Sequence, residues 1–305
     1  MGTPEISAIC LKELIASDNE IVAVVTGKDK PRGRGNVMTP TAVKALALLH
    51  SLPVYTPDSL KGEDFMELLS ELQPDLIAVV AYGKILPKSV LDFPKHGCVN
   101  VHVSLLPKYR GAAPMQRAII DGEKETGVTI MYMAEGVDTG DIISYEKFPI
   151  GAEDDFEAIH DRSAEVGASL LVKTIADIAE GKAVRTPQDD SLATHAAKIE
   201  KEDCKIDFTK SAAVLDCAIR GVTPIPGAFA YHKGKMLKIY KAKPTKGSGR
   251  PGEVIAVDAK GVGSFTVACG EGALIVYGVI PEGKGRMGAG DFVRGRKIEL
   301  GDILE

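Results

Sequence analysis

Residues 98–114 read CVNVHVSLLPKYRGAAP, and this stretch decides the fold. Its first half alternates valines at 99, 101 and 103 with polar residues at 100, 102 and 104. A period of two predicts a β-strand whose polar side chains share one face. Pro107, Gly111 and Pro114 then interrupt regular structure, so we expect the strand to open into a loop. The polar face therefore ends at the carboxyl end of a strand, where open α/β sheets hold their ligand crevice.

The residues before 185 alternate short apolar runs with amphipathic segments. Strands are predicted near residues 20–26, 53–56 and 75–81, and helices near residues 5–16, 40–50, 61–72, 114–121 and 155–180. This alternation is typical of βαβ units. It predicts a Rossmann-like α/β domain over residues 1–184, with a mostly parallel sheet and helices on both faces.

The amino-terminal end departs from this pattern. Thr3-Pro4-Glu5 is a favourable helix start, yet only Met1 and Gly2 precede it, where a βαβ protein usually has a hydrophobic strand. We therefore expect either a truncated first strand or, if the sequence is complete, a gap in the sheet and reduced stability.

The carboxyl-terminal part has a different pattern. Residues 185–205 are polar and without a strong period, which predicts a linker. After a helix near residues 210–220, short strands separated by Gly and Pro turns predict a small OB-like β-barrel over residues 206–305. This part has 17 Lys and Arg against 12 Asp and Glu from residue 201 onward, a net charge of +5, while residues 1–200 have −10. The lysines near residues 233–246 could contact a polyanion or could form a solvated strand face.

Composition narrows the remaining classes. The chain has no apolar stretch long enough to cross a bilayer and does not open like a signal peptide, so we expect a cytoplasmic protein that does not enter a membrane. We also expect a monomer. Its five cysteines are widely spaced and are expected to be buried thiols. Residues 283–288 match G-x-G-x-x-G but lie too near the end for a dinucleotide unit. The histidines at 50, 96, 160, 195 and 232 lack ligand spacing, so no metal is expected.

A second polar site follows another apolar strand. Residues 127–143 read GVTIMYMAEGVDTGDII, in which Asp138 lies in a turn between Gly136 and Gly140. This aspartate could be a structural turn residue. Together, His102 and Asp138 are the residue types that a general acid–base pair requires, and Asn100 adds an uncharged donor for an oxyanion.

These two motifs closely resemble those of the 10-formyltetrahydrofolate-dependent formyltransferases. The resemblance extends over nearly the whole chain, including GTPEIS near the start, GKDKPRGRG at 27–35, VVAYGKILP at 79–87, AIRGVTPIPG at 218–227 and the GDIL ending. It implies that Asn100, His102 and Asp138 are catalytic and that 10-formyltetrahydrofolate donates the formyl group. It also implies a folate site, formed by Ser104, Leu105, Leu106 and Pro107 with Ala81, Tyr82, Gly83, Ile85 and Leu86.

The loop GKDKPRGRG and the basic carboxyl-terminal part are similar to those of family members that formylate methionyl initiator tRNA. The resemblance implies tRNA contacts from Lys28, Lys30, Arg32 and Arg34, and the basic strand suggests Lys235, Lys238 and Lys241. Three alternatives remain open: a sugar-nucleotide or glycinamide-ribonucleotide formyltransferase, a formyltetrahydrofolate hydrolase, and a non-catalytic tRNA-binding protein. The chain departs from the family pattern at Val103, Thr223 and Ile225, which puts folate and tRNA contacts in question.

Overall fold

The computed structural model describes residues 1–33 and 35–305, which form two compact units. Unit 1 contains residues 1–111, 126–148 and 160–196, and unit 2 contains residues 112–125, 149–159 and 197–305. The segment predicted as a linker is thus divided, because residues 185–196 group with unit 1 and residues 197–205 with unit 2.

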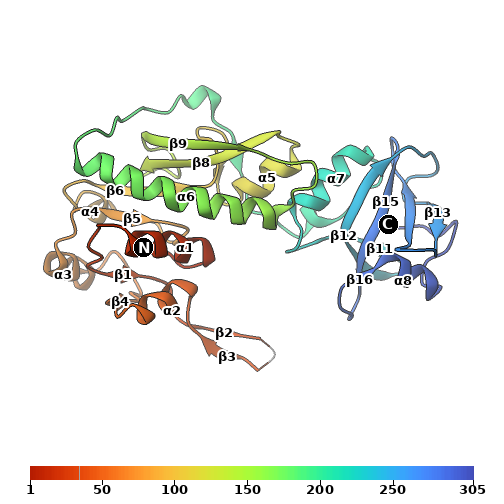
Figure 1. Cartoon of the computed structure of the whole chain (residues 1–305), viewed down its shortest axis with the longest axis horizontal. Helices are drawn as coiled ribbons and strands as arrows, with labels where there is room; N and C mark the ends of the chain where they lie inside the picture. The colour runs from red at the N-terminus through yellow and green to blue at the C-terminus, as the bar shows by residue number, and fades with distance from the viewer. Residues whose placement is uncertain (34) are drawn as a thin grey trace. The chain divides into compact units, whose positions relative to one another are not determined.

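A four-stranded sheet forms the centre of unit 1, in the order β5-β6-β8-β9 (Figure 1). Its strands are β5 (Ile77–Val79), β6 (Cys98–His102), β8 (Glu125–Tyr132) and β9 (Ile142–Pro149). β5 and β6 are parallel, whereas β8 is antiparallel to β6. The α/β class is therefore confirmed, while the sheet mixes both strand directions.

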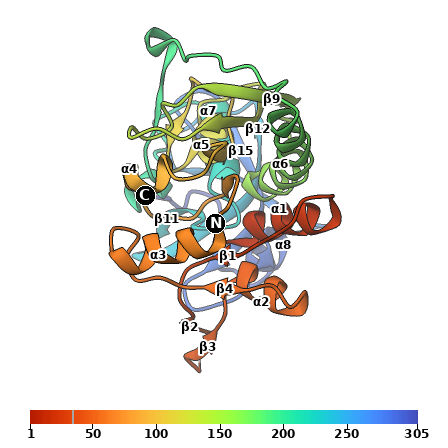
Figure 2. The same cartoon turned by 90° about the vertical axis from the view of Figure 1, so that its left-hand side faces the viewer.

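Helices and short strand pairs complete unit 1. The helices are α1 (Glu5–Ala16), α2 (Ala42–Leu49), α3 (Glu63–Leu72), α4 (Lys88–Leu91), α6 (Phe156–Ala179) and the 3-10 turn η1 (Asp190–Leu192). The paired short strands are β1 (Val24–Val25) with β4 (Val54–Tyr55), β2 (Lys30–Arg32) with β3 (Val37–Thr39), and β7 (Arg110–Gly111) with β10 (His195–Ala196). The β2–β3 hairpin projects from the rest of unit 1 in two views (Figures 1 and 2).

Helix α6 lies along one face of the four-stranded sheet (Figure 2). Gly167 allows this approach, because a Cβ atom there would lie 3.1 Å from a methyl group of Val101 and 3.4 Å from one of Val128. Since side chains alternate along a strand, Asn100 and His102 face away from α6.

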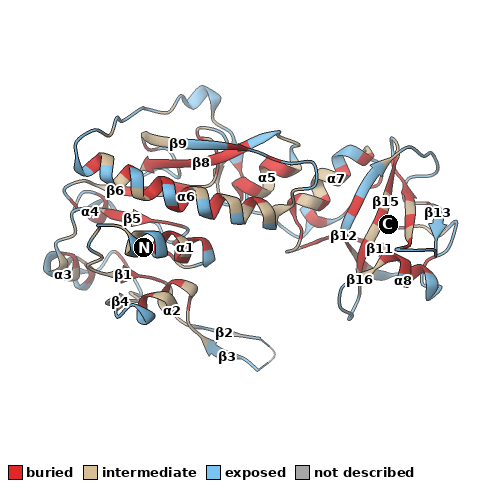
Figure 3. Cartoon of the chain, viewed as in Figure 1, coloured by how far each residue is buried: buried red, intermediate tan, exposed pale blue. Residues whose placement is uncertain are grey.

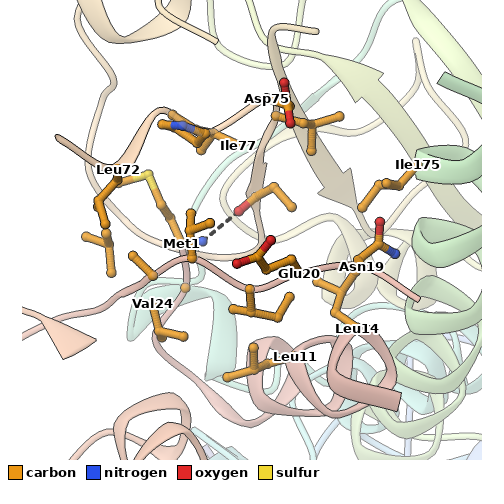
Figure 4. A pocket seen from close by; sticks show the side chains of 18 of the residues that line it. Met1, Leu11, Leu14, Asn19, Glu20, Val24, Leu72, Asp75, Ile77 and Ile175 are labelled. Carbon is orange, nitrogen blue, oxygen red and sulfur yellow. Dashed lines mark hydrogen bonds between the residues drawn. The ribbon is translucent and has the colours of Figure 1, made fainter. Parts of the chain in front are cut away.

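Met1 and Gly2 occupy the position where a first strand was expected. The Val80 amide donates a 2.9 Å hydrogen bond to the Met1 carbonyl, and the Gly2 amide donates a 3.0 Å bond to the Val25 carbonyl. A cavity of about 520 Å³ lies beside Met1 and Gly2 (Figure 4). Its lining is mainly apolar and includes Leu11, Leu14, Val24, Leu72, Ile77 and Ile175.

Unit 2 is built on an antiparallel sheet in the order β11-β12-β15-β14-β13, with β16 paired to β15. Its strands are β11 (Ala228–His232), β12 (Lys235–Thr245), β13 (Val254–Asp258), β14 (Ser264–Ala268), β15 (Ala273–Pro281) and β16 (Met287–Gly288). Its helices are α5 (Pro114–Ile120), η2 (Glu202–Cys204), α7 (Ala212–Gly221) and α8 (Ala289–Arg294). The order is open at β11 and β13 and the described strands form no closed barrel, so the predicted OB-like barrel is not confirmed.

Each unit has its own buried core (Figure 3). Of the five cysteines, Cys10, Cys98, Cys204 and Cys269 are buried and Cys217 is half-buried, and all are free thiols. Burial raises the pKa of the Cys10 and Cys98 thiols to about 12, so both are uncharged core residues as the sequence predicted.

Candidate active site

Strand β6 delivers the first two predicted catalytic side chains. Asn100 pairs with Met131 and His102 with Thr129 in the register with β8. The His102 residue is 5% exposed, whereas Asn100 is half-buried. The Asn100 amide makes no hydrogen bond to any residue in the described part of the chain, so its donors are available to a ligand.

The structure brings Asp138 to His102. Asp138 Oδ2 lies 3.5 Å from His102 Nδ1, and the two side chains are 14% and 6% exposed. On the other side of the ring, Nε2 lies 2.9 Å from the Tyr109 carbonyl oxygen. A carbonyl oxygen only accepts, so this contact is a hydrogen bond when Nε2 has the hydrogen. Nδ1 is the ring nitrogen that faces Asp138.

Three features hold the turn that contains Asp138. The aspartate has a left-handed backbone with φ of 54°, which Asp adopts more readily than most residues. A Cβ atom at Gly140 would lie 1.8 Å from the Tyr132 carbonyl oxygen, so only glycine fits there. The Gly111 amide donates a 2.8 Å hydrogen bond to Asp138 Oδ2 and holds the carboxylate against the loop that follows β6.

Residues 186–196 also contribute to this site, although the sequence predicted only a linker there. β10 pairs in parallel with β7, which aligns His195 with Arg110 and Ala196 with Gly111. The Thr194 side chain accepts a 2.8 Å hydrogen bond from the Tyr109 amide. Gln188 donates hydrogen bonds to the Asp138 and Gly140 carbonyls. No periodicity or motif marks these residues, so no signal in the sequence could have identified them.

The predicted folate residues follow two neighbouring parallel strands. Residues 81–86 come after β5 and residues 104–107 after β6, so both groups start from the same edge of the sheet. Tyr82, Leu86, Ser104 and Leu106 are buried, whereas the Ile85 side chain is 78% exposed. The Ser104 hydroxyl donates a 2.7 Å hydrogen bond to the Lys108 carbonyl and thereby closes the loop after β6. Their role toward folate stays a prediction.

The basic residues predicted to contact tRNA lie in both units. Lys28 precedes the β2–β3 hairpin and pairs with Asp58, Lys30 and Arg32 belong to β2, and Arg34 lies outside the described residues. In unit 2, β12 has a register shift between Ile239 and Ala242. Ala242 after it is buried, so Lys241 returns to the outward side of the strand with Lys238. Lys235 is exposed at the start of β12.

The positions that depart from the family pattern are placed differently. Val103 is half-buried beside the site, and Thr223 is 5% exposed and donates a 2.8 Å hydrogen bond to the Ile219 carbonyl. The Ile225 side chain is 73% exposed. In the described ranges 1–33 and 35–305, no group of three or more His, Cys, Asp or Glu residues could hold a metal ion. No helix there is long and apolar enough to cross a membrane.

Two family descriptions match this chain. "Formyl transferase" matches residues 2–175, and "Formyl transferase, C-terminal domain" matches residues 198–297. Among solved structures, an N-formyltransferase from Helicobacter canadensis, in complex with folinic acid and dTDP-3-aminofucose, has a TM-score of 0.66 at 20% identity, covering 90% of this chain and 96% of that one. This likeness shows a shared fold.

Sequence relatives give a narrower assignment. Methionyl-tRNA formyltransferase from Moorella thermoacetica is 48% identical, covering the whole of this chain and 97% of that protein. The Citrifermentans bemidjiense protein of the same name is 45% identical, covering the whole of this chain and 95% of its own length. The motifs around Asn100, His102 and Asp138, the two family matches and this full-length similarity agree: the chain belongs to the methionyl-tRNA formyltransferase family.

Proposed function

We propose that the protein transfers the formyl group of 10-formyltetrahydrofolate to the α-amino group of methionine esterified to initiator tRNA. The observation that carries this proposal is the His102–Asp138 pair, with Nδ1 and Oδ2 3.5 Å apart, on the same strand face as the Asn100 amide, which has no hydrogen-bond partner among the described residues. The acceptor named for the relatives supports the choice of substrate. A tRNA substrate also implies that the enzyme acts in the cytoplasm.

The Asn100 amide stabilises the negative charge that forms during attack. The neutral amine attacks the formyl carbon, a C–N bond forms, and the formyl oxygen becomes an oxyanion in a tetrahedral intermediate. The Asn100 side chain supplies an uncharged N–H donor for that oxygen from a rigid strand. Loss of one such donor typically raises the barrier by about 2.7 to 4 kcal/mol, which lowers the rate roughly 10²- to 10³-fold.

The His102–Asp138 pair moves the protons. The attacking nitrogen becomes an ammonium and must lose a proton, whereas N10 of the folate leaves well only when it gains one. His102 Nδ1 and Asp138 Oδ2 face one another at 3.5 Å, slightly longer than an ordinary hydrogen bond of about 2.7 to 3.2 Å, so a small movement brings the two atoms within proton-transfer distance. The pair takes the ammonium proton and returns one to N10 as the old C–N bond breaks, with a typical gain of about 10² to 10⁴ in rate.

Substrate contacts follow from the segments beside the pair. In this proposal the segments 81–86 and 104–107 bind the folate at the carboxyl edge of β5 and β6. Lys28, Lys30, Arg32 and Arg34 contact the acceptor end of the tRNA, and the outward lysines of β12 contact its phosphates. Unit 2 acts as an OB-like module. The pairing of Leu304 with His232 and of Ile303 with Glu253, which links the two open edges, supports this description.

A formylation assay tests the proposal. Transfer of label from 10-formyltetrahydrofolate to methionyl-tRNA is measured for the wild type and for the H102A, D138N and N100A variants, with a dTDP-amino sugar as the competing acceptor. His160 offers a matched control, because it also pairs with an aspartate, Asp161, at 3.0 Å but lies on α6. We expect H160A to keep wild-type activity and the three site variants to lose it. Formylation of the sugar alone, or full activity of H102A, would refute the proposal.

A further inference from the structure

Gln188 is turned inward from a surface segment. In the stretch 184–190 it is the half-buried residue, whereas Val184, Arg185 and Asp190 are exposed like the others there. Its Nε2 donates to the Asp138 carbonyl at 2.9 Å and to the Gly140 carbonyl at 2.7 Å. One amide group therefore binds both ends of the turn that presents the Asp138 carboxylate.

Arg110 determines which way this amide points. Its Nε and Nη2 atoms donate to Gln188 Oε1 at 3.0 and 2.8 Å. A guanidinium group only donates, so the oxygen of Gln188 must face Arg110 and the NH₂ group must face the two carbonyls. Arg110 itself begins β7, which ends at Gly111, whose amide binds the Asp138 carboxylate.

These contacts hold Asp138 from two sides. The Gly111 amide binds the carboxylate, and Gln188 binds the carbonyl of the same residue, whose backbone is in the left-handed region. A left-handed aspartate persists only where its surroundings determine it, because the conformation is unfavourable by itself. Without Gln188 the Asp138 and Gly140 carbonyls lose their shared donor and the turn can relax, which moves Oδ2 relative to His102 Nδ1.

We propose that Gln188 is a positioning residue for the reaction: its amide, oriented by Arg110, fixes the turn that aims the Asp138 carboxylate at His102. This inference rests on the proposed function, since it assigns Gln188 a role only through Asp138. Gln188 touches no reacting atom in this scheme. Its contribution is to geometry, and a misplacement of about 1 Å in such a site can lower the rate on the order of 10²-fold.

The substitution Q188E isolates the two hydrogen bonds to the turn. A glutamate carboxylate still accepts hydrogen bonds from Arg110 but has no N–H group, so it cannot donate to the Asp138 and Gly140 carbonyls. Q188A removes the hydrogen bonds from Arg110 as well as those to the two carbonyls. We expect kcat to fall on the order of 10- to 100-fold in both variants, with KM for each substrate and the melting temperature close to wild type. S191A is the matched control, because its hydroxyl bonds only to Asp189 in the same segment.

A double-mutant cycle distinguishes positioning from a general structural role. If Gln188 acts through Asp138, Q188E lowers kcat in the wild type but has little further effect in a D138N background. Equal losses in both backgrounds, or a loss of melting temperature that matches the loss of activity, would overturn the inference. Full activity of Q188E and Q188A alongside an inactive D138N would overturn it while leaving the proposed function intact. An active D138N would instead overturn the proposed function.

Discussion

Replacing Gly111 with alanine tests how tightly the loop after β6 must fit. Gly111 has φ of 119°, a region that side chains rarely adopt. An added Cβ atom would lie 2.8 Å from the Ala196 carbonyl oxygen and 2.9 Å from His195 Cε1. G111A therefore strains its own backbone and also forces β7 to move away from β10, which withdraws its amide from Asp138.

The expected loss of stability follows from these two contributions. A strained backbone conformation costs about 1 to 3 kcal/mol. A hydrogen bond to a charged group, such as the 2.8 Å bond to Asp138 Oδ2, contributes about 1.5 to 3 kcal/mol. Together these contributions predict that G111A lowers the free energy of unfolding by about 2.5 to 6 kcal/mol, out of a typical total of about 5 to 15 kcal/mol. Formylation should fall at least tenfold even at temperatures where the variant is folded.

Gly181 provides the control for backbone strain alone. It also has a positive φ, of 70°, but no heavy atom lies within 4 Å of the position of an added Cβ atom. G181A should lose only about 1 to 2 kcal/mol and keep its activity. Thermal unfolding and initial formylation rates are measured for both variants. If G111A has the same melting temperature as G181A and transfers formyl groups at the wild-type rate, then the Gly111 amide in the loop after β6 does not hold Asp138 in place.

Three further changes test other parts of the molecule. Replacing Arg34 by alanine should lower activity on charged tRNA far more than folate binding, and equal losses in both would contradict a tRNA contact. Joining a short apolar extension to Met1 should fill the cavity of about 520 Å³ and raise the melting temperature by at least roughly 5 °C. The reason is that each buried apolar side chain contributes about 1.5 to 3 kcal/mol to stability. No gain in melting temperature would contradict the idea that the cavity can hold an added strand. The Arg117 guanidinium lowers the pKa of Asp203 below its usual value of 3.8. The stability that D203N loses should therefore be constant near neutral pH and disappear as the pH falls below 3.8. A pH-independent difference between wild type and D203N in urea unfolding would show that this ion pair is not the source of the lost stability.

Local signals in the sequence account for the parts of the site that were predicted. The period-two alternation at residues 98–104 is a property of one strand, and it correctly predicted that Asn100 and His102 share a face of that strand. The glycine at 140 marked the tight turn at Asp138 for the same local reason. Contacts between distant segments leave no such signal. Gln188 lies 50 residues from Asp138 in a polar segment, so its contact with Asp138 is evident only in the folded chain.

Strand boundaries were less predictable because pairing partners set them. The apolar run at 20–26 predicted a longer strand, but only Val24–Val25 forms β1. Those two residues pair with β4 on one side, and on the other side Gly2 alone reaches Val25. Apolar residues without a neighbouring strand to bond are not held in a ladder, so the observed strand is as short as its partners allow.

The geometry of the site changes what an intact set of catalytic residues means. The presence of Asn100, His102 and Asp138 weighed against a non-catalytic tRNA-binding protein at the level of sequence. In the structure, His102 Nε2 contacts the Tyr109 carbonyl oxygen, which leaves Nδ1 facing Asp138, and the Gly111 amide binds the Asp138 carboxylate. A relative with all three catalytic residues but a side chain at position 111 would lack this arrangement. Activity should therefore depend on the loop after β6 and on residues 186–196 as well as on the three residues that we propose to be catalytic.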